Sequence, residues 1–250
     1  MGPSVEPITL TRLALILIPV FVVVAIQWRW SLSGRTSIYG LARMVTQLLV
    51  VGYVLIFLFD SDQPLLVLTI LAVMIVVASW IALRPLRFKI KSLYLIAIGA
   101  ISIGSLPVLV ISTQLVIQVE PWFEPRYLIP LAGMIFSNAM NSVSIAAERF
   151  QAELDRDSTP IQARNIAMNA AMIPLVNSLF AVGIVSLPGM MTGQVLSGIS
   201  PLIAARYQIL VMCMLFSASG ISAACYLNWL TRRKINTPKR NDQTTAKQAR

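Results

Sequence analysis

Seven long apolar segments constrain this chain more than any other feature of its sequence. A transmembrane helix needs about 20 mostly apolar residues to cross the hydrocarbon core of a bilayer. The 250-residue chain is 57% hydrophobic and only 12% charged, whereas a soluble domain usually carries about 25% charged residues. We therefore predict an all-α integral membrane protein with about seven spans, near residues 8–26, 38–59, 65–83, 93–119, 127–147, 166–187 and 202–230.

These spans form one polytopic domain over residues 1–235, and we expect the polar, basic tail over residues 236–250 to be disordered. The first span lacks the basic start of a signal peptide, because Glu6 precedes it. Trp28 and Trp30 follow it and suit the membrane interface. We expect this first helix to be retained.

The distribution of charge predicts the orientation. With the N-terminus outside and the C-terminus in the cytoplasm, 16 of the 20 basic residues fall inside, as the positive-inside rule requires. The net charge of the chain, +10, is then explained by topology and attraction to anionic lipid, and nucleic acid is excluded as a partner. The inner residues are Arg29, Arg35, Arg84, Arg87, Lys89, Lys91, Arg149, Arg156, Arg164, Arg232, Arg233, Lys234, Lys239, Arg240, Lys247 and Arg250; the outer loops carry Glu6, Asp60, Asp62, Glu120 and Glu124.

The residue types argue against an enzyme and against a metal site. The chain has no histidine, the commonest general base and metal ligand. Cys213 and Cys225 lie in one apolar run and are expected to be small buried hydrophobes. The sequence also lacks the GxxxxGK[ST] motif, so we expect no catalytic residue, no metal, no bound cofactor and no ATP bound by a P-loop of this chain.

Polar residues inside the spans are costly in lipid and tend to face other helices or water. They form a stripe on the fifth span, and Pro174 is expected to kink the sixth span. Two interpretations remain open: hydrogen bonding between packed helices, or lining of a translocation path. The residues are Arg43 and Gln47 on the second span, Ser137, Asn138, Asn141, Ser142, Ser144 and Glu148 on the fifth, and Asn165, Asn169 and Asn177 on the sixth.

The segment AERFQAELDRDSTPIQARN (residues 147–165) is the longest polar stretch between spans. Its mixed charges and Pro160 predict a short surface helix, a turn and a helix that enters the membrane. A partner subunit that supplies energy would dock here, although a solvated connector would have a similar sequence.

Two stretches carry a resemblance to a known family. PLAGMIFSNAMNSVSIAAERF (residues 130–150) and STPIQARNIAMNAAMIPLVNSLFAVGIVSLPGMMTGQVLSGISPLIAARYQILVMCML (residues 158–215) resemble the Fet-type iron export permeases of bacteria, and are similar to plant permeases linked to aluminium tolerance. VSLPGMMTG followed by GISPLIAARYQI is the most specific element. Weaker similarity extends back through ARMVTQLLVVGYVL (residues 42–55), so that the resemblance covers nearly the whole chain.

The resemblance implies the membrane half of an ABC transporter in the bacterial inner membrane. Two copies of the permease would pair with two separate ATPase subunits and export iron by alternating access, with a role in resistance to peroxide stress. The segment expected to couple to the ATPase includes Glu148, Arg149, Glu153, Asp157, Thr159, Pro160 and Arg164. A secondary transporter of another solute and a membrane assembly protein remain alternatives.

This segment departs from the family pattern. Asp157 stands where the family has a glycine, and the helix before it is expected to be shorter by about ten residues, or three turns. Asp157, Ser158 or Thr159 would each suit the N-cap of the following helix.

The last motif is SLPGMMTGQVLSGISP (residues 186–201), on the outer side in this topology. Pro188 and Gly189 are expected to end a helix, Gly193 and Gly198 to let the backbone fold back, and residues 194–196 to form a short re-entrant turn. Met190 and Met191 suit adaptable packing. The alternative is an outer gate.

Overall fold

The computed structural model describes residues 9–30, 34–59, 63–86 and 91–235, and these ranges fold as helices joined by short turns. One isolated bridge pairs Val182 with Ser186, and no named strand occurs in the described ranges. The all-α prediction is confirmed. Some residues used above for orientation lie outside the described ranges: Glu6, Asp60, Asp62, Arg87, Lys89 and the basic residues of the tail after 235.

The chain divides into two compact units, residues 1–62 and 63–250. In the first, α1 (Leu10–Leu15) is followed by α2 (Leu17–Arg29), and α2 packs with α3 (Gly34–Phe59). The hydroxyl of Ser37 donates a hydrogen bond to Oε1 of Gln27 at 2.7 Å and joins α2 to α3. Most of the apolar side chains in these helices are exposed within the chain, as expected for helices that contact lipid.

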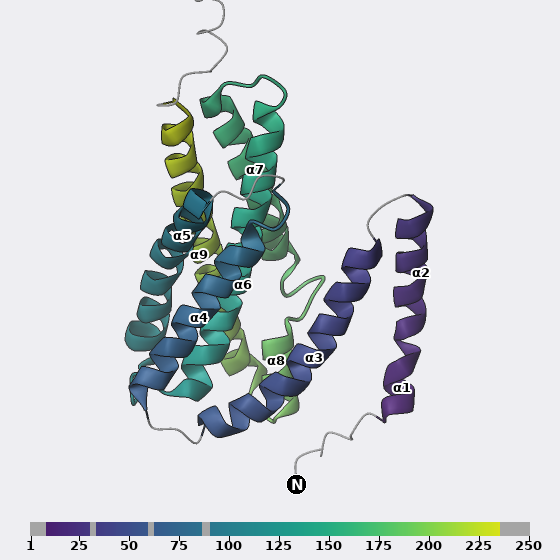
Figure 1. Ribbon diagram of the computed structural model, residues 1–250. Helices are drawn as coiled ribbons and strands as arrows, with labels where there is room; N and C mark the ends of the chain where they lie inside the picture. Colours follow the sequence, from purple (N-terminus) through teal and green to yellow (C-terminus); the bar gives the residue numbers. More distant parts are fainter. Residues whose placement is uncertain (1–8, 31–33, 60–62, 87–90, 236–250) are drawn as a thin grey trace, which may run out of the picture. The chain divides into compact units, whose positions relative to one another are not determined.

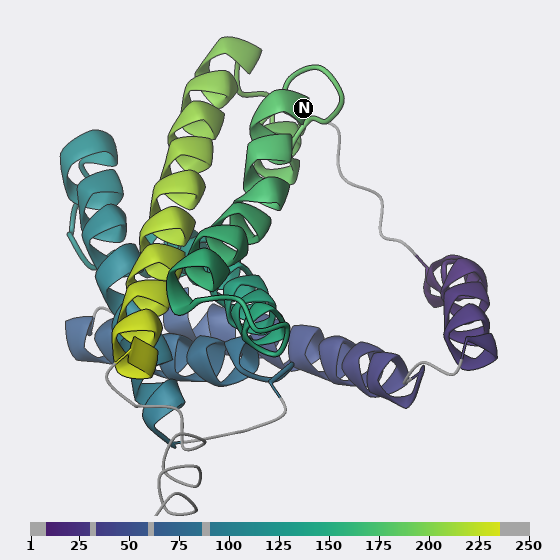
Figure 2. The ribbon, with the colours of Figure 1, turned by 90° about the horizontal axis from the view of Figure 1, so that it is seen from above.

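The second unit contains α4 (Pro64–Ala82), α5 (Lys91–Val110), the π-helix η1 (Ile111–Ile117), α6 (Pro125–Leu154), α7 (Pro160–Ala181), α8 (Gly189–Leu196) and α9 (Pro201–Ile235). Four of these helices begin at proline, whose missing N–H costs nothing in the first turn. The long helix α9 packs against α5, α6, α7 and α8. Figure 1 shows α9 beside α5, and Figure 2 shows it running alongside α7.

Six helical segments of the described chain are long and apolar enough to cross a membrane: 11–29, 34–59, 64–82, 91–117, 125–154 and 201–235. They confirm a multi-pass membrane protein. The predicted span 166–187 falls mainly on α7, which has 22 residues but does not reach the same hydropathy. The number of crossings, and with it the orientation of the termini, stays a prediction.

The α5–α9 contact is built from small side chains. Gly104 on α5 faces α9, and a Cβ added there would lie 2.6 Å from the backbone nitrogen of Ser222 and 2.9 Å from the carbonyl oxygen of Ala218. Ser105, Ser219 and Ser222 are buried near this contact. Small residues let membrane helices approach closely and gain dispersion contacts, so this contact forms the centre of the second unit.

The predicted order of helix, turn and helix after residue 147 is confirmed, because α6 continues to Leu154 and α7 begins at Pro160. One helix end differs from the prediction. α7 ends at Ala181 instead of 187, because Gly183 adopts φ 83° and its N–H bonds to the carbonyl of Ser186 at 2.9 Å.

The second unit gathers basic segments at one end. The guanidinium of Arg233, near the end of α9, donates to the hydroxyl of Ser92, near the start of α5. Figure 1 shows the α6–α7 turn at the same end, and Figure 2 looks down on it. The opposite end carries Glu120 and Glu124 before α6. Within the second unit, the basic residues of the α6–α7 turn and of the end of α9 therefore lie at the same end, and the orientation in the membrane stays a prediction.

Candidate functional site

The turn between α6 and α7 is organised around one buried carboxylate. Glu153 is only 5% exposed although it lies near the end of α6. Its Oε1 lies 2.8 Å from Nη2 of Arg149 and 3.4 Å from Nη1 of Arg156. Its Oε2 accepts a hydrogen bond from the Ser158 hydroxyl at 3.3 Å. A buried charge needs such partners to offset its lost hydration, so the turn has a defined conformation.

The backbone of the turn explains its unusual residues. Asp157 has φ 61°, in the left-handed region, which glycine adopts freely and aspartate tolerates better than most residues. This conformation would explain the glycine that the Fet-type permease pattern has at the position of Asp157. Of the three possible caps, the structure selects Thr159, which forms a capping box with Gln162, and Pro160 is the first residue of α7.

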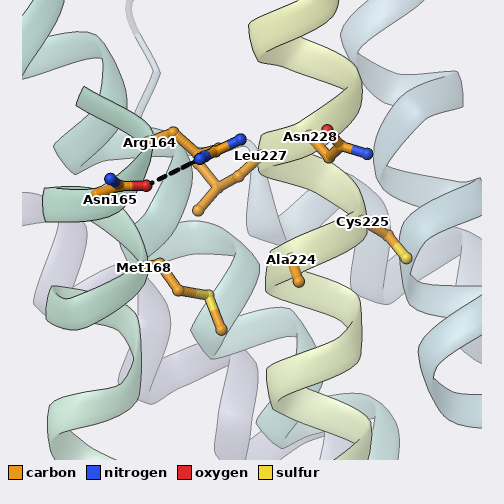
Figure 3. Close-up of a pocket in the computed structure, with 7 residues that line it drawn as sticks. All are labelled: Arg164, Asn165, Met168, Ala224, Cys225, Leu227 and Asn228. Carbon is orange, nitrogen blue, oxygen red and sulfur yellow. Dashed lines mark hydrogen bonds between the residues drawn. The ribbon is translucent and has the colours of Figure 1, made fainter. Parts of the chain in front are cut away.

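A cavity of about 360 Å³ lies beside this turn, between α7 and α9. Figure 3 shows Arg164 and Met168 reaching from α7 toward α9, with Nε and Nη2 of Arg164 bonded to Oδ1 of Asn165 at 3.2 and 3.1 Å. Asn228 adds an amide from α9. This cavity offers donors to a polar or anionic group at the basic end of the unit.

The polar faces of α6 and α7 are only partly used inside the chain. Ser137 and Asn138 donate to the carbonyl of Met134 on their own helix at 3.1 and 2.9 Å. Asn141 is exposed, and so are Glu148, Asn165, Asn169 and Asn177. Packing within this chain therefore buries Ser142 and leaves these side chains exposed. In a membrane, exposed amides require water or a partner protein.

The region around α8 differs from the prediction. Pro188 and Gly189 begin α8 instead of ending a helix, because the preceding helix has already ended at Ala181. Gly193 and residues 194–196 lie inside α8, so neither the predicted fold-back at Gly193 nor the predicted re-entrant turn is found. Gly198 does turn the chain, with φ 89°.

The two methionines of α8 line different cavities. Met190 lines a cavity of about 450 Å³ together with Met134 of α6 and Tyr207 of α9. Met191 lines a separate cavity of about 360 Å³ between the end of α7, α8 and α9. The short helix α8 therefore contributes to both cavities. If Met190 and Met191 served only to fill space between helices, open cavities beside both of them would not be expected.

Both cysteines are free, and neither is fully buried: Cys213 is exposed and Cys225 is half-buried. The prediction of buried cysteines is therefore wrong. Cys213 lies on a face of α9 turned away from the packed core and lines the cavity of Met191. The sequence did not predict that Met191 and Cys213 line the same cavity. Nor did it predict a role for the amides of Gln194 and Gln208, whose Oε1 atoms are buried without a hydrogen-bond partner in the described chain. A polar residue within an apolar run was the available signal.

Arg43 and Gln47 lie on α3, in the first unit, where Arg43 is half-buried and Gln47 is exposed. Their part in a path with α6 and α7 stays a prediction. Among the described residues, no group of three or more His, Cys, Asp or Glu side chains is placed to hold a metal ion.

Comparison with known proteins agrees with the resemblance described above. The chain is 37% identical over 229 residues to a UPF0014 membrane protein of Synechocystis, with 84% of this chain and 87% of the relative covered. It is 35% identical over 243 residues to the probable iron export permease protein FetB of Escherichia coli, covering 89% and 91%. It is 30% identical over 233 residues to the Arabidopsis protein ALUMINUM SENSITIVE 3, covering 86% and 84%.

No solved structure matches the chain. The sequence matches the family described as uncharacterised protein family UPF0014 over residues 10–164 and 161–235. These two matches include every helix of both units. The chain is a multi-pass membrane protein and belongs to the UPF0014 family.

Proposed function

We propose that this protein is the permease subunit of an ABC-type transporter that exports iron across the bacterial inner membrane. Two copies would pair with two copies of a separate ATPase, which binds and hydrolyses ATP. The name of the Escherichia coli relative, probable iron export permease protein, supports the substrate and the permease role. This chain would supply the path through the membrane and bind no nucleotide itself.

The α6–α7 turn is the observation that carries the proposal. It lies at the basic end of the second unit, and α6 extends seven residues beyond the predicted end of its apolar span, from 147 to Leu154. Glu153 holds both sides of the turn through Arg149 and Ser158. A segment that transmits the closing of an ATPase must move as one piece, because a loose connector would absorb the motion.

The exposed amides of α6 and α7 support a partner and a path. Asn141 and Asn177 are exposed in the single chain, and such groups in a membrane face protein or water instead of lipid. A second copy of the permease would cover this face and enclose a polar route. Alternating access would then open the route to one side at a time, with α8 and its two cavities at the other end from the ATPase.

Iron would not move as a bare ion held by carboxylates. The acidic residues among the described positions lie near helix ends and in turns, and they form no ligand cluster. Fe²⁺ and Fe³⁺ favour oxygen and nitrogen ligands. The cavity of Met190 and the cavity beside the α6–α7 turn provide such atoms through amide side chains and Tyr207. A complexed form of iron fits these cavities better than a bare ion does.

The deciding experiment uses sealed vesicles that contain the permease and its ATPase, loaded with labelled iron. ATP-dependent movement of iron is expected, and the same vesicles with a catalytically inactive ATPase should show none. Equal flux in both preparations would reject the proposal. Purification of the tagged permease should also recover the ATPase, and its absence would favour a secondary transporter or an assembly protein.

A further inference from the structure

Three sulfur-containing side chains from two helices line the cavity between α7, α8 and α9. Met191 comes from α8, and Met212 and Cys213 come from α9. The cavity measures about 360 Å³, which is ample for a single ion and its ligands. Thiolates and thioethers are soft ligands that select Cu(I) over harder ions such as Mg²⁺ and Ca²⁺.

A buried polar group faces the same cavity. Gln208, one helical turn before Met212, is 5% exposed, and its Oε1 has no hydrogen-bond partner in the described chain. A buried carbonyl oxygen without a partner costs free energy. A cation in the cavity would offset that cost. The amide therefore gives a reason, independent of the sulfur atoms, to expect a positive ligand.

The other residues that line the cavity determine which charge a bound ion can carry. Leu179, Val182 and Ile209 make it apolar, and no charged side chain lines it. An ion that remains charged after binding would be strongly disfavoured in such surroundings. A monovalent ion bound to one thiolate gives a neutral complex, whereas Fe²⁺ bound to the same thiolate would keep a positive charge.

We propose that this cavity binds a soft monovalent metal ion, Cu(I) or Ag(I), through the Cys213 thiolate and the thioethers of Met191 and Met212. The Cys213 thiol loses its proton to water as the sulfur–metal bond forms, and the metal keeps its oxidation state. Gln208 is a positioning residue whose amide oxygen faces the bound cation. Met190 and Cys225 line other cavities and do not take part.

This inference goes beyond iron export and does not depend on it, because binding of Cu(I) needs neither the ATPase nor transport. If the chain fails to bind Cu(I), ATP-driven iron flux can still be measured and still tests the proposed function. If the vesicles move no iron, the Cu(I) titration still tests whether this cavity binds the ion.

The test is a titration of Cu(I) into the full-length protein in detergent, under reducing and oxygen-free conditions, against a chromophoric Cu(I) chelator. One Cu(I) per chain is expected, with release of one proton per ion. Loss of even an outer-shell partner typically lowers metal affinity by about 10–100-fold, so Cys213→Ser and Met191→Leu should each lower it at least about tenfold. Cys225→Ser and Met190→Leu are matched controls and should retain the affinity of the original chain.

Met191→Leu preserves the size and polarity of the side chain, so it tests the ligand even where Cys213→Ser impairs folding. Proton release gives a second readout, and Cys213→Ser should abolish it. Failure of the original chain to compete with the chelator would overturn the proposal. So would equal affinities for Cys213→Ser and Cys225→Ser.

Discussion

Nη2 of Arg149 lies 2.8 Å from Oε1 of Glu153, one helical turn further along α6. The glutamate side chain is 7% exposed and the arginine side chain 39%, so water screens this pair only in part. Nε of Arg149 is buried and finds no partner within the described chain. The guanidinium therefore offsets the burial of the carboxylate, which also connects α6 to the turn through Ser158.

Replacement of Glu153 by alanine should loosen the α6–α7 turn. Hydrogen bonds to charged groups contribute about 1.5–3 kcal/mol, and partial exposure of Arg149 places the expected loss at the lower end. Hydrogen–deuterium exchange should become faster over residues 154–160, and ATP-dependent flux should fall more than ATPase binding. Glu148→Ala, on the exposed face of α6, is the comparison variant and should leave exchange in the turn unchanged. Equal exchange in both variants would refute the role of Glu153.

Asp157 allows a test of the left-handed turn. A residue with a Cβ pays about 1–2 kcal/mol in this conformation, and Asp157 has φ 61°. Asp157→Gly and Asp157→Ala both remove the carboxylate, so the difference between them reports the backbone alone. The glycine variant should be more stable by about 1 kcal/mol in thermal unfolding. An alanine variant of equal stability would mean that the turn adopts another conformation.

The glycines around α8 should respond differently to alanine. Gly183 and Gly198 have φ 83° and 89°, and alanine there should lower stability by about 1–2 kcal/mol. Gly193 is helical, with open space around the position of a Cβ, so Gly193→Ala should hold or raise stability. An added Cβ at 193 has no atom of this chain within 4 Å outside its own helix backbone and its neighbours. A fall in transport for Gly193→Leu with unchanged stability would therefore support the gate, and full transport would argue against it.

Gly104→Ala should disrupt the contact between α5 and α9. Its Cβ would lie 2.6 Å from a backbone nitrogen and 2.9 Å from a backbone oxygen, which cannot move away as a flexible side chain would. Overpacking of this kind costs about 1–3 kcal/mol. Gly133→Ala is the control, since its Cβ would lie 3.6 Å from Cε of Met74. Thermal unfolding in detergent should separate the two variants, and similar midpoints would contradict the contact.

Cysteine labelling should determine whether α7 crosses the membrane. In a background of Cys213→Ser and Cys225→Ser, single cysteines at Ser158 and Gly198 lie at opposite ends of the segment that contains α7. An impermeant thiol reagent added outside intact cells should label Gly198→Cys and spare Ser158→Cys. Labelling of both cysteines from the same side would show that α7 does not cross the membrane. The predicted orientation would then be wrong for one of the two chain termini.

Hydropathy located the six helices of the described chain that are long and apolar enough to cross a membrane, because lipid requires long apolar stretches with satisfied backbone groups. It was less informative at the helix ends. The apolar run stops near 147, while local propensity and the Arg149–Glu153 pair extend α6 to Leu154. Pro188 was predicted to end a helix, but proline also occurs frequently at the start of a helix. The structure places Pro188 directly before the first turn of α8.

The candidate site was predicted only where its residues are neighbours in the sequence. The α6–α7 turn fits within 17 residues, Glu148 to Arg164, and most of its charged residues were named from the sequence as coupling candidates. Asp155 was not named, and Arg156 was named only as a basic residue of the inner side. The cavity of Met191 and Cys213 depends on how α8 packs against α9, and no periodicity in either helix reveals that contact. For the same reason the exposure of Cys213 could not be deduced from the apolar residues around it.

The contact at Gly104 also has a consequence for biosynthesis. α9 is made after α5, α6, α7 and α8, so a nascent chain inserts those helices while the surface of α5 that will receive Ser222 still faces lipid. Two of the buried serines at this contact, Ser219 and Ser222, belong to α9, and Ser105 belongs to α5. A chain that stops short of α9 would leave Gly104 of α5 without the backbone that packs against it, and membrane quality control has there a surface by which to recognise an incomplete product.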